Sequence, residues 1–520
     1  MPDNKRSKQQ SDVQIKREEL EYIQERYVTI SDAIEGQHAV KYKTSKYLPM
    51  PSDCKSVLDE RYVAYMTRAV YYNVCQPTRD ALVGQIFLRP PVVELPDGLE
   101  FMNKNINGEN LTLQQLAKKA ANHVLPYGRG GFLADFPQTD GEVSRGEIEN
   151  GIRPTIRFFA PWTIRNWKVE KIGTEYKIVM LVLDEAFEQT NSKNEFDIET
   201  VIHHRVYRLT NRGSKEEPNY CCSMDRYDEN GDIIESMDIC GSDAIPLKEI
   251  PFEPIGSLNN DMEIDEPPFT NLANLNLAHF RNSADYEESV FLVGQPTPVY
   301  AGLTTDWVEN YFDKGVKFGS RASIPLPENG TAELLQAQPN SLAFEAMTHK
   351  EDQMIAIGAK IIDTDQKIEK REAEVQVETA SQKSILMTVR DNLQMALFKA
   401  VQKAAAFIDI EVDEKKHKIE LNENFDLTAM DPDELRLSSE LYQKGELILK
   451  EHRASLIRSG KATETDIEEF KKQVMEDKKL KESLQPPEPT PVGNGSNNNG
   501  QGNQNRLTQS TQKKGNPDGS

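Results

Sequence analysis

The sequence predicts an α+β protein, with helices at both ends and a β-rich region between them. Apolar residues recur at helical spacings of three and four before Gly131 and again after Phe269. Between about Gly131 and Ile255 their period changes to two, which is typical of strands. No glycine or proline lies between Gly358 and Pro432, so this part of the chain favours long helices.

Composition narrows the possible functions. The chain has 520 residues, enough for several domains, with 37% apolar residues, 28% charged residues and a net charge of −22. This charge argues against nucleic-acid binding by phosphate neutralisation, although DNA could slide past such a surface without sticking. No segment has the run of apolar residues of a membrane span, and the first residues lack the apolar core of a signal peptide. We therefore expect no membrane association and synthesis in the cytosol.

Three amphipathic helices are predicted before the β-rich region. The first covers residues 13–34, the second about 57–88 and the third 111–125. Pro77 should kink or split the second helix, and Pro126 should end the third. The strands then follow, separated by turn-forming residues, in the segments FLADF, TIRFFA, YKIVMLVLDEA, IETVIHHRVYRL, YCCSMDRYD and DIIESMDI.

The second half of the chain reads as helices around two short interruptions. A helix over 269–292 is followed by a Pro- and Gly-rich insert at 296–340 and a helix over 342–362. A long helix from about Glu372 to Ile408 carries one apolar face. The members of that face are Leu386, Val389, Leu393, Ala396, Leu397, Ala400, Val401 and Ala404. At 1.5 Å per residue this helix would be roughly 55 Å long, a length that suits an elongated structural element.

The C-terminal part is predicted as one strand, two helices and a tail. Residues 417–427 alternate like a returning strand, and helices are expected over about 433–458 and 464–480. The residues from Pro486 onwards are mainly Pro, Gly, Asn, Gln and Ser, which cannot bury a core.

The glycine cluster YGRGG, Tyr127 to Gly131, allows two interpretations. A phosphate-binding loop would need a preceding strand, a following helix and a lysine, whereas here the order is helix, loop, strand. A helix-to-strand turn fits better. The segment DRYDENGDIIE resembles a calcium loop, but the alignment puts Arg226 where a carboxylate is required, so a hairpin turn is preferred.

The remaining reactive residues indicate no enzyme, metal site or cofactor. His203 and His204 are adjacent on a strand, so their side chains point to opposite faces and cannot share a metal ion. Cys221 and Cys222 could form a redox pair, although reduced thiols on neighbouring faces of a strand fit better. The charged stretch from Asp363 to Glu374 is either a solvated loop between helices or a loop that projects into a channel.

The order of elements from about residue 15 to 480 resembles the portal proteins of tailed double-stranded DNA bacteriophages, and more narrowly an uncharacterised portal-like phage family. The segments that carry the resemblance are LAHFRNSADYEESVFLVGQPTPVYAGL (Leu277 to Leu303), SLAFEAMTHKEDQMIAIGAKIID (Ser341 to Asp363) and the earlier YGRGGFLADFP. No single motif is diagnostic, but the ordered succession is fairly specific.

The resemblance implies the portal architecture: an α/β wing, a helical stem, a small β-rich clip, a long spine helix, a helical crown and a disordered tail. Its implied boundaries are a disordered start at 1–12, the wing at 13–268, stem helix 1 at 269–295, the clip at 296–340, stem helix 2 at 341–362, the tunnel loop at 363–372, the spine helix at 373–408, a returning wing strand at 409–430, the crown at 431–482 and the tail at 483–520.

The resemblance also implies site residues. In the tunnel loop, Asp365, Lys367, Lys370 and Arg371 would face DNA in the channel. Met347, Met354 and Ile361, spaced seven apart, are expected to pack the stem. The loop has no glycine hinge, which leaves open whether it moves.

The function implied is a ring, typically of twelve copies, at one capsid vertex. Its channel would conduct double-stranded DNA non-specifically during packaging and ejection. Partners would be the terminase large subunit, the major capsid and scaffold proteins and the head–tail adaptor, and the protein would reside in the virion after synthesis in the host bacterial cytoplasm. Such proteins have no catalytic residues or cofactors. The alternatives are a virion adaptor or scaffold protein without a pore, which has no need of the insert at 296–340, and a nucleotide-dependent enzyme, which would need a phosphate-binding loop.

Overall fold

The computed structural model describes residues 12–138, 151–191, 194–214, 217–294, 297–312, 326–335, 341–362, 384–423, 432–449, 452–453, 456 and 470–476. The chain divides into two units, Met1–Phe425 and Asp426–Ser520. The first unit is a mixed α+β structure with several antiparallel sheets, as the sequence predicts.

Helices form the N-terminal part of the first unit. They are α1 (Glu18–Glu35), α2 (Gln37–Tyr42), α3 (Glu60–Arg68) and α4 (Cys75–Ile86), with short 3-10 turns at Asp12–Gln14 and Thr44–Lys46. α1 confirms the first predicted helix: it buries Leu20, Ile23, Tyr27 and Ile30 on one face. The expected second helix is indeed split.

The split does not lie at Pro77. α3 ends at Arg68 and α4 begins at Cys75, so Pro77 lies in the first turn of α4. In a first turn the missing N–H of proline costs no intrahelical hydrogen bond. The break instead comes where Ala69 takes an extended backbone, with ψ 136°.

α5 (Leu113–Tyr127) corrects the expected end of the third helix. Pro126 lies inside the last turn, and the helix ends at Gly128, whose φ of 76° is in the left-handed region. Thr112 and Gln115 form a capping box at its start. The YGRGG cluster is therefore a helix-to-strand turn, because β2 (Arg129–Asp135) begins directly afterwards.

Two antiparallel sheets follow α5. β2 is the centre of a three-stranded sheet, between β3 (Thr155–Phe159) and β9 (Phe252–Gly256). The five-stranded sheet has the order β4-β5-β6-β7-β8. Its strands are β4 (Ile164–Ile172), β5 (Glu175–Asn191), β6 (Asn194–Asn211), β7 (Tyr220–Tyr227) and β8 (Ile233–Asp238). All six predicted strand segments are strands, and β4 and β9 are two additional ones.

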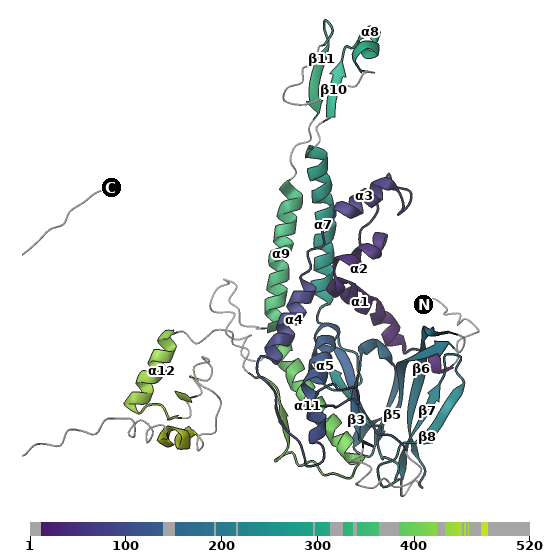
Figure 1. The fold of residues 1–520 in the computed structure, drawn as a ribbon, viewed down its shortest axis with the longest axis vertical. Coiled ribbons are helices and arrows are strands. Elements are labelled where there is room, and N and C mark those ends of the chain that lie inside the picture. The colour runs from purple at the N-terminus through teal and green to yellow at the C-terminus, as the bar shows by residue number, and fades with distance from the viewer. Residues whose placement is uncertain are drawn as a thin grey trace, which may run out of the picture. The chain divides into compact units, whose positions relative to one another are not determined.

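The insert expected at 296–340 lies between two helices of the first unit. α7 (Thr270–Gly294) is followed by a hairpin of β10 (Thr297–Ala301) and β11 (Thr331–Leu335), and then by α9 (Ser341–Ile362). The helices α7 and α9 lie side by side, and the hairpin joins their ends (Figure 1). One small helix, α8 (Thr305–Trp307), continues into a π-helical turn at Val308–Phe312.

α11 (Ile385–Ala406) differs from the expected long helix at its start. The Ser384 side chain accepts a hydrogen bond from the Met387 N–H at 3.2 Å, and Ser384 has an extended backbone with ψ 151°. This N-cap starts the helix later than the expected position near Glu372. Residues 373–383 of the predicted helix lie outside the described residues. The predicted apolar face is confirmed, since all eight of its members are at most 1% exposed.

α11 lies at the centre of the first unit, where it packs on β2, β9 and α5. Lys403 reaches the sheet: its Nζ donates to the Phe252 carbonyl at 2.8 Å and pairs with Glu253 at 3.3 Å. After α11 the chain returns as β12 (Lys418–Glu420), which pairs with β1 (Val92–Glu94). β12 lies within the predicted returning strand.

The second unit contains α12 (Pro432–Lys444). The expected helix over 433–458 ends early, because Gly445 has a φ of 76°, which is left-handed. Further on, His452 stacks on Tyr442 with ring centroids 4.8 Å apart. The described residues 470–476 are helical, inside the predicted last helix. The tail after residue 476 lies outside the described residues.

Candidate functional site

The antiparallel pair of α7 and α9 is the candidate functional element. His279 Nε2 on α7 lies 3.0 Å from Glu351 Oε1 on α9, and the Tyr286 and Phe344 rings lie 6.0 Å apart. From the first pair to the second, the residue number rises along α7 and falls along α9, so the two helices run in opposite directions. Such a pair with an insert at its joined end is a stalk that carries a small tip.

The methionines expected to pack the stem occupy different environments. Met354 is 1% exposed, whereas Met347 is half-buried. The side chain of Ile361 lies outside the described residues, although its backbone belongs to α9. The structure thus places Met354 in the core of the first unit.

Asn276 holds the base of α7 in place and was not singled out from the sequence. It is fully buried, and its Oδ1 accepts hydrogen bonds from the Tyr71 hydroxyl at 2.9 Å and the Val74 N–H at 3.2 Å. Its Nδ2 donates to the Tyr72 carbonyl at 2.7 Å. These bonds satisfy the backbone of the segment that splits α3 from α4. The only sign of this role in the sequence is that Asn276 lies among leucines and alanines of a predicted helix.

Further along α7, ionic contacts hold α3. The Tyr65 hydroxyl donates to Asp285 Oδ1 at 2.6 Å, and Arg68 pairs with Glu288. Burial raises the pKa of Tyr65, and the hydrogen bond to Asp285 raises it further, so the phenol stays protonated. Beyond this point Val290, Phe291 and Leu292 are 41–56% exposed. The outer part of α7 therefore presents apolar side chains that the described residues leave partly exposed.

The tip has its own small packing. In the hairpin, Thr297 pairs with Leu335 and Ala301 with Thr331. Trp307 of α8 is 6% exposed, and its ring lies 6.3 Å from that of Tyr300. The tip is thus a distinct β-rich element between the two helices.

The expected channel residues Asp365, Lys367, Lys370 and Arg371 lie outside the described residues. The chain segment that carries them connects α9 to α11. Their role stays a prediction.

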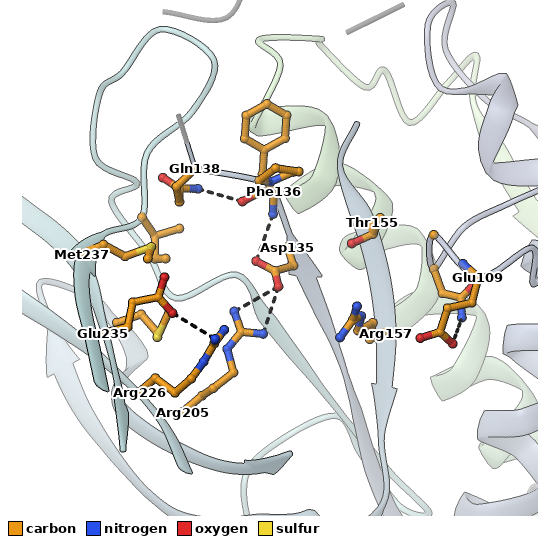
Figure 2. A pocket seen from close by; sticks show the side chains of 15 residues that line it. Glu109, Asp135, Phe136, Gln138, Thr155, Arg157, Arg205, Arg226, Glu235 and Met237 are labelled. Carbon is orange, nitrogen blue, oxygen red and sulfur yellow. Dashed lines mark hydrogen bonds and ion pairs between the residues drawn. The ribbon is translucent and has the colours of Figure 1, made fainter. Parts of the chain in front are cut away.

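A polar pocket of about 370 Å³ lies between the three-stranded and the five-stranded sheet (Figure 2). Arg205, 4% exposed, donates from both terminal nitrogens to Asp135 Oδ2 at 2.9 and 3.0 Å, and Arg226 pairs with Glu235 at 3.1 Å. Burial by itself lowers the pKa of Arg205, but Tyr207 and Asp135 outweigh it and raise the pKa. Because each of these arginines already has an acidic partner, the pocket is best explained as an ion-paired joint between the sheets.

The other residues weighed in the sequence have structural roles. His204 Nδ1 lies 2.7 Å from Asp184, while the His203 ring lies 4.8 Å from that of Phe187, so the two histidines have different partners. Asp228 accepts hydrogen bonds from the backbone N–H groups of Asn230 and Asp232, as in the preferred hairpin turn. These and neighbouring donors lower the pKa of Asp228.

Glycine in the YGRGG cluster is explained by packing. A Cβ at Gly130 would lie 2.6 Å from the Phe158 ring, and one at Gly131 would lie 2.1 Å from the Phe252 ring.

Cys221 and Cys222 are free and buried. Among the described residues, no group of His, Cys, Asp and Glu is arranged to hold a metal ion, and no helix is long and apolar enough to cross a bilayer.

Comparison with known proteins gives a partial family match. Residues 268–408, from just before α7 to just after α11, match the family described as Domain of unknown function (DUF4055). No curated protein sequence matches the chain.

Three solved structures are similar at low sequence identity. The first is a chain of the virion of a native gene transfer agent particle: identity 13%, TM-score 0.40, covering 81% of this chain and 98% of that one. The second, from the neck of an empty particle with C6 symmetry, has 13% identity and a TM-score of 0.39, covering 83% and 100%. The third, from the neck of a native particle with C12 symmetry, has 12% identity and a TM-score of 0.37, covering 81% and 98%.

Proposed function

We propose that the chain is a portal protein: a structural subunit that forms a ring at one vertex of a phage-like capsid and conducts DNA during packaging and ejection. The observation that carries this proposal is the antiparallel pair of α7 and α9 with a β-hairpin at its joined end, set on an α+β base. A stalk with a small tip offers a docking surface beyond the ring body. The tip would serve the terminase first and the head–tail adaptor later.

Charge and exposed apolar surface support the same proposal. A net charge of −22 per chain would give a ring a channel that repels the DNA backbone, so that DNA passes without being trapped. The exposed Val290, Phe291 and Leu292 on α7 offer surface that neighbouring subunits would cover. The proposal includes residence in the virion and contacts with capsid and scaffold proteins, and it assigns no catalytic step to the chain.

The deciding experiment is the native mass of the purified full chain by light scattering, with negative-stain images of the same peak. We expect a ring with a central hole; twelve copies of the 59.0 kDa chain give about 700 kDa. A monodisperse monomer or dimer, even with scaffold protein added, would overturn the proposal. It would favour the adaptor without a pore.

The channel loop is a separate part of the proposal. Lys367, Lys370 and Arg371, in the segment between α9 and α11, would touch DNA phosphates briefly. Replacing all three by alanine should lower packaged genome length or particle yield. Normal values for both would remove the loop from the mechanism but leave the ring intact.

A further inference from the structure

A shallow hollow of about 560 Å³ lies over the line where α7 meets α9. Its apolar lining comes from Leu275 and Ala278 on α7 and from Ala356 and Ile357 on α9. We call it the seam groove. The two alanines keep its floor low, so that another helix could approach closely.

None of the described residues that line the seam groove is charged. Its remaining lining residues are Asn271, Asn274 and Gln353, which are neutral and exposed. In a chain with 28% charged residues such a patch is unusual. Two copies with a net charge of −22 repel each other, and an uncharged apolar patch is where they can approach with the least repulsion. Because the described lining of the groove contains no cation, it does not suit DNA phosphates.

The same chain exposes apolar side chains on α3 and beside its two ends, which we call the α3 face. Val63 and Val70 are 48% and 49% exposed, and Leu58 is 83% exposed. Figure 1 shows α3 and α9 on opposite sides of α7. The contacts of Tyr65 with Asp285 and of Arg68 with Glu288 fix α3 on α7, so this face is presented rigidly.

We propose that the seam groove of one copy receives the exposed α3 face of a second copy. Because groove and face are different surfaces on opposite sides of α7, the contact is heterologous, and repetition around an axis closes a ring. The inference rests on the proposed portal function and names the surfaces through which its subunits meet.

The test introduces a charge or bulk into the groove of the full chain. Gln353→Glu keeps the shape of the side chain but adds a negative charge, and Ala278→Trp fills the floor. Each should raise the protein concentration needed for half-assembly by about tenfold or more. Gln189→Glu, an exposed position on β5, is the matched control and should assemble like the wild type. Circular dichroism melts of the unassembled chains should coincide, which separates an assembly defect from misfolding.

Cross-linking tests the pairing directly. In a Cys54→Ser background, a Val63→Cys chain mixed with an Ala356→Cys chain should give a disulfide-linked dimer of the two chains under mild oxidation. Failure to cross-link in rings that assemble normally would overturn the inference, as would normal assembly of both groove variants. If the wild type forms no ring under any condition, the portal function fails and the inference falls with it. A wild-type ring that ignores the groove variants overturns the inference alone.

Discussion

α9 and α11 have the same length of 22 residues but bury very different shares of their side chains. α11 buries ten residues against α5, β2 and β9. Where the side chains of α9 are described, only Met354 and Gly358 are buried, while Leu342, Phe344 and Ile355 are 55–72% exposed. The difference shows that α11 is stabilised by burial within its own chain, whereas α9 keeps large apolar side chains exposed among the described residues.

The largest expected effect is the loss of a core side chain from α11. Leu393 is fully buried, so Leu393→Ala should lower the free energy of unfolding by about 2–5 kcal/mol, because it removes apolar contact and leaves a cavity. Urea unfolding followed by circular dichroism measures it. Met395→Ala on the same helix, at a side chain 51% exposed, is the control and should change stability by less than about 0.5 kcal/mol. Equal losses at the two positions would contradict the burial contrast.

Substitution of Asn276 tests whether its hydrogen bonds stabilise the base of α7. Asn276→Ala should lower the free energy of unfolding by about 1–3 kcal/mol, because buried backbone and hydroxyl groups of Tyr71, Tyr72 and Val74 lose their partner. The exposed neighbour Asn274, changed to alanine, should have almost no effect on the same denaturation curve. A similar response at both positions would mean that the hydrogen bonds of Asn276 contribute little net stability.

The apolar periodicity of α11 was sufficient to predict its buried face, and the alternation in the β-rich region was sufficient to predict six of its strands. The start of α11 was not predictable from periodicity, because the helical pattern continues upstream of Ser384 and only its hydroxyl, as an N-cap, marks the boundary. The break between α3 and α4 was assigned to Pro77 because proline is the strongest local signal. The structure puts it where Asn276, distant in sequence, supplies the hydrogen bonds.

The candidate site was predictable as an order of elements rather than as residues. A helix, an insert rich in Pro and Gly, and a second helix were all visible in sequence, and α7, the hairpin and α9 follow that order. The seam groove was not visible, because it depends on which faces of α7 and α9 meet. Leu275 and Ile357 look like ordinary core residues in the sequence, and only their partial burial shows that they line a surface.

A pH experiment probes the five-stranded sheet, which the comparison of the two helices leaves out. Burial by itself would raise the pKa of Asp184, but hydrogen bonds from His204 and Arg165 outweigh it and lower the pKa. A lowered folded pKa gives stability that is present above the unfolded pKa of about 3.9 and is lost as the pH falls through the folded value. The wild type should therefore lose stability more steeply than Asp184→Asn between about pH 5 and pH 3. Parallel urea midpoints for the two proteins would show that Asp184 is not the group responsible.

The smallest expected effect separates two adjacent residues of α9. Ile355 is 68% exposed, so Ile355→Ala should change the free energy of unfolding of the unassembled chain by less than about 0.5 kcal/mol. Changing its neighbour Met354, which is 1% exposed, to alanine should lower the free energy of unfolding by about 2 kcal/mol or more. Both are measured by urea unfolding at a protein concentration too low for assembly. If Ile355→Ala costs as much as Met354→Ala under those conditions, α9 is buried within its own chain, and its contrast with α11 disappears.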